Sequence, residues 1–127
     1  MSFYAIAAVG AGAAFGAWLR WGLGLLLNPV FPTLPLGTLA ANLVGGYFIG
    51  VAVEYFFHNH ALPPEARLFI ITGFLGGLTT FSTFSAEAVT LLLREQYAWA
   101  LTISVAHLAG SMLMTILGIA TIKFLMQ

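Results

Sequence analysis

Residues Gly76 to Ser85 read GGLTTFSTFS, and they combine the groups from which an ion path could be built. They lie inside an uncharged run from Leu68 to Ala86 that is long enough to cross a bilayer. Polar groups at membrane depth are costly, and they usually serve a water-filled path or an ion site. The stretch therefore indicates ion conduction.

The glycine pair Gly76-Gly77 predicts a break in the third helix near the middle of this run. A break leaves backbone carbonyls and N–H groups without helical partners. Opened backbone of this kind coordinates small cations in several transporters. A packing kink explains the glycines equally well, so both interpretations stay open here.

Phe81 and Phe84 follow the glycines three residues apart and share one face of a helix. Aromatic ring edges carry partial positive charge, so two of them could line an anion path without a full charge. Ser82 and Thr83 continue the polarity, and Glu87 lies one turn beyond Thr83. The alternatives are phenylalanines that only pack and a glutamate that reaches the headgroups.

Other apolar segments also carry polar side chains. Ser104, His107, Ser111 and Thr115 recur at spacings of three, four and four, which predicts one stripe on a helix. Asn42 is the one amide inside the second segment. Serine and threonine often bond back to their own helix, and a buried asparagine can join helices, so these residues suit either packing or an anion path.

The composition predicts an all-α integral membrane protein with one domain, residues 1–127. Of its 127 residues, 61% are hydrophobic and only 6% are charged, against about a quarter in a soluble domain. The predicted spans are about Phe3 to Leu27, Leu36 to Phe57, Glu65 to Arg94 and Tyr97 to Phe124.

Several function classes are disfavoured. The chain has no cysteine, no aspartate and a net charge of zero, which gives no thiolate site, no acid pair at catalytic spacing and no basic face for nucleic acid. No nucleotide-binding motif is present, and His58 and His60 read as loop residues rather than a metal site. We therefore expect neither an enzyme nor a nucleotide-driven pump.

The positive charges give no orientation. Arg20 and Arg94 fall on one side of the predicted membrane topology, and Arg67 and Lys123 fall on the other. This tie is either a coincidence or the mark of a dual-topology protein, which inserts in both orientations. Four helices leave little room for a pore inside one subunit, so polar stripes on several of them favour an oligomer.

With these residues in hand, the chain resembles the Fluc (CrcB) family of fluoride channels over its full length. Residues Gly76 to Ser85 resemble the third-helix motif of that family. Asn42, in Asn42-Leu43-Val44-Gly45, matches its pore asparagine, and residues Gly16 to Arg20 resemble its first-helix Gly/Arg signature.

The resemblance implies an antiparallel, dual-topology homodimer with two pores and a broken third helix. It also implies a structural Na⁺ at the dimer centre, held by the backbone carbonyls of Gly76 and Thr79 from both subunits. Phe81 and Phe84 match the pore phenylalanines of the family, and Ser111 and Thr115 match its polar track on the fourth helix.

The implied function is passive export of fluoride across the plasma membrane (the inner membrane in a Gram-negative source), which confers fluoride resistance. Arg20 is expected in a vestibule or structural role, and the expected fluoride path comprises Asn42, Phe81, Ser82, Thr83, Phe84, Glu87, His107, Ser111 and Thr115. Two alternatives stay open: a dual-topology, proton-coupled cation exporter that uses Glu87, and an accessory subunit without transport of its own.

Overall fold

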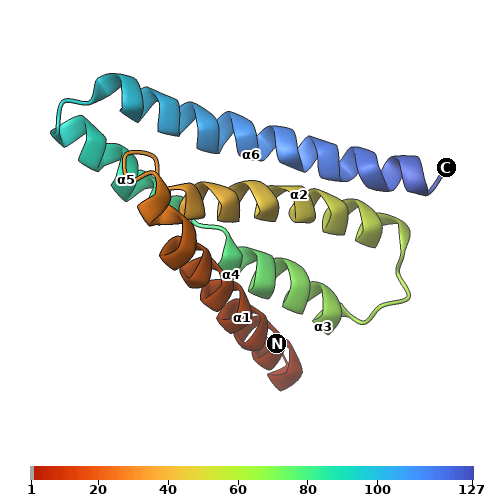
Figure 1. Cartoon of the computed structure of the whole chain (residues 1–127). Coiled ribbons are helices and arrows are strands. Elements are labelled where there is room, and N and C mark those ends of the chain that lie inside the picture. The colour runs from red at the N-terminus through yellow and green to blue at the C-terminus, as the bar shows by residue number, and fades with distance from the viewer. Residues whose placement is uncertain (1) are drawn as a thin grey trace.

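The computed structural model describes residues 2–127 as a bundle of long helices. The elements are α1 (Phe3–Leu27), the short 3₁₀ turn η1 (Asn28–Val30), α2 (Leu36–His58), α3 (Pro64–Arg67), the π-helical segment η2 (Leu68–Leu75), α4 (Gly76–Leu78), α5 (Phe81–Leu93) and α6 (Tyr97–Leu125). Segments α3 to α5 together make the third span. Both termini and the α2–α3 connection lie toward one end of the bundle, and the other two connections lie toward the opposite end (Figure 1).

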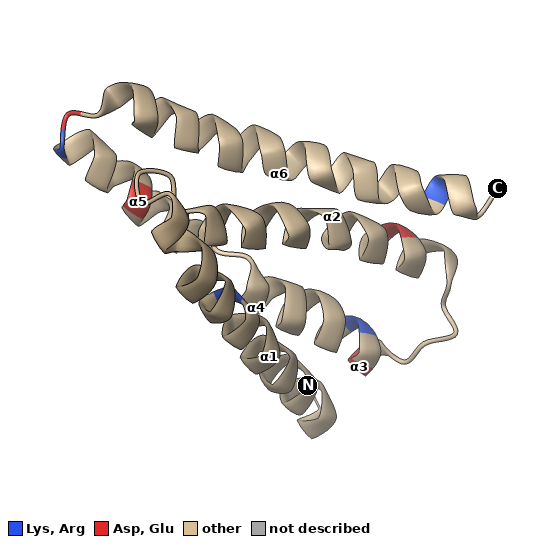
Figure 2. Ribbon diagram, in the orientation of Figure 1, with Lys and Arg blue, Asp and Glu red and all other residues tan. Residues whose placement is uncertain are grey.

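Four helical segments are long and apolar enough to cross a membrane: Phe3–Val30, Leu36–His58, Pro64–Leu93 and Tyr97–Leu125. These bounds confirm the four predicted spans to within a few residues. Charged residues are few, and long parts of each of the four spans carry none (Figure 2). Many large apolar side chains are exposed, as expected for helices that are surrounded by lipid rather than by water.

Close packing depends on glycines along two seams. In the first seam, Gly50 of α2 lies against the backbone of α6 at Thr115, and Gly118 of α6 lies against α2 at Tyr47. In the second, a Cβ added to Gly77 of α4 would lie 2.5 Å from the carbonyl oxygen of Ala13 in α1. Helices in lipid associate through such close approach, since no hydrophobic force drives them together.

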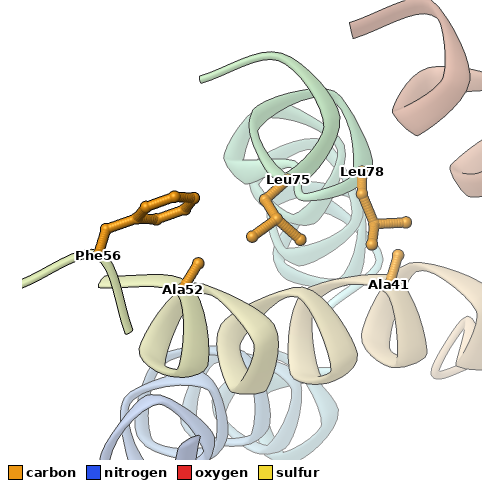
Figure 3. Close-up of a cluster of buried hydrophobic side chains, with 5 residues drawn as sticks. All are labelled: Ala41, Ala52, Phe56, Leu75 and Leu78. Atoms are coloured by element: carbon orange, nitrogen blue, oxygen red, sulfur yellow. The ribbon is translucent and has the colours of Figure 1, made fainter. Parts of the chain in front are cut away.

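A small core joins α2 to the first half of the third span. Figure 3 shows Ala41, Ala52 and Phe56 of α2 facing Leu75 of η2 and Leu78 of α4. Leu78 is fully buried, so the end of α4 is held firmly against α2 just before the backbone changes direction.

The α5–α6 turn brings the two helices alongside each other. Glu95 takes a positive φ of 60°, and the N–H groups of Glu95 and Gln96 donate to the carbonyls of Leu92 and Leu91 at 3.0 and 2.9 Å. This pattern is a Schellman motif with a glutamate where glycine is usual. It places Phe84 of α5 against His107 of α6.

The predicted position of the interruption in the third span was wrong. Gly76 has helical backbone angles, φ −64° and ψ −38°, and belongs to α4 with Gly77. The residues with extended backbone are Thr79 (ψ 154°) and Thr80 (φ −150°, ψ 121°). The glycines stay helical because Gly77 packs closely against α1. Thr80 can leave the helix because its N–H and its hydroxyl find partners in Asn42 and in the Thr83 N–H.

The glycine seams give the first prediction. Gly118→Ala should destabilise the protein by about 1–3 kcal/mol, because the new methyl group meets backbone that cannot move aside. Gly10→Ala and Gly22→Ala are matched controls, since a Cβ at either position meets nothing within 4 Å. The controls should be neutral or slightly stabilising, because alanine favours the helix. Apparent melting midpoints in detergent measure the difference, and equal midpoints for all three variants would contradict the packing argument.

Candidate functional site

The extended residues Thr79 and Thr80 release backbone groups from the helix. In an unbroken α-helix the Thr80 N–H would donate to Gly76, and the Thr83 N–H to Thr79. Here the Thr80 N–H donates to Asn42 Oδ1 at 2.7 Å, and the Thr83 N–H donates to Thr80 Oγ1 at 3.1 Å. Both carbonyls, of Gly76 and Thr79, therefore lose their usual helical donors.

A third carbonyl at the same place is bound by an arginine. The Nε–H of Arg20, from α1, donates to the Gly77 oxygen at 3.0 Å. A cation at this position also opposes the negative end of the helical segment that stops at Leu78. Arg20 thus joins α1 to the backbone at the end of α4.

Asn42 of α2 is the central polar side chain of the site. Its amide oxygen accepts from the Thr80 N–H, and its Nδ2 donates both to the Thr80 oxygen and to His107 Nδ1, each at 2.9 Å. Both amide hydrogens and the amide oxygen therefore have protein partners. Asn42 joins α2 to the start of α5 and to α6.

A pocket of about 330 Å³ lies beside this network. Its lining includes Asn42, Thr79, Phe81, Phe84, His107, Ser111 and Thr115. The rings of Phe81 and Phe84 meet edge to face, 5.3 Å between centroids at 82°. Phe84 is buried, whereas Phe81 is 69% exposed on the single chain, so the pocket has an open side there.

The fourth-helix hydroxyls in and near the pocket differ in what they can offer. Thr115 Oγ1 lies 2.9 Å from the Gly46 oxygen and 3.0 Å from the Ser111 oxygen, so its one hydrogen is committed to backbone. Ser104 donates to Ala100 of its own helix and does not line the pocket. The Ser111 hydroxyl makes no hydrogen bond to residues 2–127, which leaves it available to a ligand.

Thr83 and Glu87 line a second pocket, of about 360 Å³, toward the α5–α6 turn. Glu87 Oε2 accepts a hydrogen bond from the Thr38 hydroxyl at 2.7 Å. Glu87 Oε1 is buried and has no partner within residues 2–127. One half of the carboxylate is thus held by α2, and the other half is free to bind.

The remaining predicted residues lie apart from the main pocket. Ser82 is exposed, with Oγ 3.4 Å from Thr80 Oγ1. Gly76 is also exposed on the single chain. Arg20 and Thr83 line a third pocket of about 300 Å³ together with Thr38 and Thr80.

Sequence reasoning missed three residues that organise the site. Thr80 caps α5, and a threonine directly before an apolar helical run was a readable helix-start signal. Thr38 lies one turn before Asn42 on the same face, which was a second available signal. Asn28 caps α2 from outside, accepting from the N–H groups of Gly37 and Thr38 at 2.8 and 3.2 Å. Nothing local in the sequence indicated that last contact.

Four apolar spans around buried polar groups define a small multi-pass membrane protein. Comparison with known families agrees. Residues 7–119 match the model of the CrcB-like protein family, described as Camphor Resistance (CrcB). The chain belongs to this family.

Curated relatives cover nearly the whole chain. A protein of Nitrosospira multiformis named Fluoride-specific ion channel FluC is 73% identical over 127 residues, covering 100% of this chain and 99% of its own. Relatives with the same name from Thiobacillus denitrificans and Ralstonia pickettii are 63% and 59% identical, covering 95% and 97% of this chain and 98% of each relative.

Proposed function

We propose that this protein is a fluoride-selective channel, and not an enzyme, that lets cytoplasmic fluoride leave passively across the plasma membrane. The observation that carries the proposal is full-length identity of 73% to a relative named as a fluoride-specific ion channel. The pocket at Phe81, Phe84 and Ser111 supports it, because ring edges and a free hydroxyl suit a small anion.

The hydration of fluoride sets what a selective path must provide. Fluoride is small and strongly hydrated, so a selective path must replace its water with other donors. Conduction requires binding that is strong enough for entry and weak enough for release. Neutral donors satisfy both conditions. An inside-negative membrane potential then drives the anion outward, by about 2.3 kcal/mol per 100 mV for one charge.

The proposed path passes two of the pockets. The larger group of residues lies in the first pocket: Asn42, Phe81, Phe84, His107, Ser111 and Thr115. Ser82 lies beside Thr80 at the start of α5, and Thr83 and Glu87 continue toward the second pocket. Because hydrogen fluoride crosses membranes uncharged and ionises in the more alkaline cytoplasm, such a path confers fluoride resistance without coupling to a nucleotide.

The second prediction tests this function. In liposomes that contain only the purified protein, a fluoride electrode should record fluoride release. Phe81→Ile and Phe84→Ile keep bulk and apolarity but remove the polarised edge. Each should reduce fluoride flux about tenfold or more, the factor that corresponds to losing roughly 1.4 kcal/mol of ion stabilisation.

The same assay separates the alternatives. Cation export by a buried carboxylate predicts that Glu87→Gln abolishes transport while the phenylalanine variants alter only the substrate range; the unpartnered Oε1 of Glu87 is the observation that favours this reading. An accessory subunit predicts no flux from the protein alone. Unchanged fluoride flux in both isoleucine variants would refute the role given to the rings.

We further propose that the working unit is an antiparallel, dual-topology homodimer in which the interruption at Thr79 and Thr80 lies at the interface. The two-against-two distribution of Arg20 and Arg94 against Arg67 and Lys123 supports insertion in both orientations. The exposure of Phe81 and Gly76 on the single chain supports an interface on that side, since both belong to the proposed site.

The third prediction concerns this dual topology. Two lysines added after Gln127 should bias insertion to one orientation and reduce fluoride export in cells. Co-expression with an oppositely biased copy should restore export, and two added glutamines serve as the control. Full export from a uniformly oriented population would rule out the antiparallel dimer.

We also propose one structural Na⁺ at the dimer centre, bound by the Gly76 and Thr79 carbonyls of both subunits. These oxygens suit a hard cation, because the N–H groups that would bind them in a helix are bound elsewhere. The Thr80 N–H donates to Asn42, and the Thr83 N–H donates to the Thr80 hydroxyl. The positive charge of the ion would attract the carbonyl oxygens of both subunits and so hold the two interrupted third spans together. Side-chain ligands are not required, and residues 2–127 contain no cluster of acidic or histidine ligands.

The fourth prediction follows from ligands contributed by two subunits. An ion bound only by the dimer stabilises the dimer by mass action. Replacing Na⁺ with N-methylglucamine during purification should lower the dimer fraction measured by light scattering, and returning Na⁺ should restore it. Thr79→Ser, which keeps the carbonyl, should respond like the original protein. A dimer that is indifferent to Na⁺ would exclude the site.

A further inference from the structure

His107 carries a buried polar atom that the described residues leave unpaired. The side chain is 3% exposed, and its Nε2 has no hydrogen-bond partner within residues 2–127. The ring lines the 330 Å³ pocket and stacks on Phe84, with centroids 4.6 Å apart at 22°. Buried polar groups in folded proteins nearly always have a partner, so an unpartnered one beside a pocket calls for a water, an ion or another bound group.

The orientation of the Asn42 amide is fixed by the backbone of Thr80. A main-chain N–H can only donate, so the Asn42 atom 2.7 Å from the Thr80 nitrogen must be the oxygen. The amide nitrogen then faces the Thr80 oxygen and His107 Nδ1, each at 2.9 Å. If the amide oxygen and nitrogen of Asn42 were exchanged, the amide nitrogen would face the Thr80 N–H, donor against donor. The amide oxygen would then face the Thr80 oxygen, acceptor against acceptor.

The Asn42 amide in turn fixes the tautomer of His107. Because Asn42 Nδ2 only donates, His107 Nδ1 must accept, and the ring hydrogen of the neutral imidazole must be on Nε2. A second proton, on Nδ1, would point at an N–H of Asn42. The contact thus favours a neutral ring whose Nε2–H is a donor without an acceptor.

We propose that His107 Nε2–H donates a hydrogen bond to fluoride in this pocket, and that Asn42 is a positioning residue that acts on the anion through His107. This inference rests on the proposed function and refines it. Asn42 has no amide hydrogen left for an anion, whereas His107 has one with no other use. The chain thereby obtains a rigid donor from histidine without placing a full positive charge in the path.

The fifth prediction is spectroscopic and uses the unmodified protein. With ¹⁵N-labelled histidine in lipid nanodiscs, His107 should show the neutral tautomer protonated at Nε2. Sodium fluoride should shift its Nε2–H resonance, and sodium chloride at equal concentration should not. The other two histidines, His58 and His60 in the α2–α3 region, are internal controls and should not respond.

Substitutions of His107 test the same donor role through fluoride flux in liposomes. His107→Gln places an amide N–H close to the position of Nε2 and should keep most fluoride flux. His107→Phe keeps the stacked ring without a donor and should lose about tenfold to a hundredfold, the range for a hydrogen bond to a charged group. Ser104→Ala is the control, because that hydroxyl bonds to its own helix and lies outside the pocket.

The outcomes separate this inference from the function on which it rests. If the original protein releases no fluoride, the proposed function itself fails. If it releases fluoride but His107 is protonated on Nδ1, or its Nε2–H resonance ignores fluoride, the donor role is wrong. Full flux in a folded His107→Phe variant would overturn it as well, and an unfolded variant leaves the spectroscopic result to decide.

Discussion

The structure depends on how the third span satisfies its backbone where the helix stops at Thr79 and Thr80. A bilayer core offers no water to free N–H and C=O groups, so each needs another partner. The Thr80 N–H finds Asn42 of α2, the Thr83 N–H finds the side chain of Thr80, and the Gly77 oxygen finds Arg20 of α1. The interruption therefore ties three spans together at one level of the bundle.

The glycine seams explain why these partners are within reach. Arg20 lies four residues beyond Gly16, and Asn42 lies four residues before Gly46, so each polar side chain shares a helical face with a close-packed glycine. Gly16 meets the backbone of Phe74 and Leu78, and Gly46 meets that of Ser111. Close backbone approach on these faces brings the side chains of Arg20 and Asn42 within hydrogen-bond distance of the neighbouring helical segments. Packing and polar chemistry are thus set by the same rows of residues.

Sequence reasoning predicted the spans well because length and hydropathy determine them almost alone. It misplaced the interruption because a glycine pair lowers helix stability only modestly, by about 1 kcal/mol per residue, and close packing of Gly77 on Ala13 outweighs that preference. Phe81 and Phe84 were predicted from residue types that repeat on one helical face, and the structure brings both rings to one pocket. Contacts such as Thr38 to Glu87 join segments far apart in the chain, and no local pattern specifies them.

The arrangement of charge bears on how an anion could pass. Arg20 is the cation nearest the interruption, yet its Nε–H is bound to the Gly77 oxygen, and it does not line the pocket at Phe81 and Phe84. A full charge 4 Å from an anion would attract it by about 4 kcal/mol at an effective dielectric constant of 20, which opposes release. Neutral donors bind less strongly and lose most of their value when misaligned. A path built from neutral donors therefore needs donors with fixed orientations. The hydrogen bonds from Thr80 to Asn42 and from Asn42 to His107 fix these orientations. They start from the Thr80 backbone, whose N–H needs a partner in the membrane in any case.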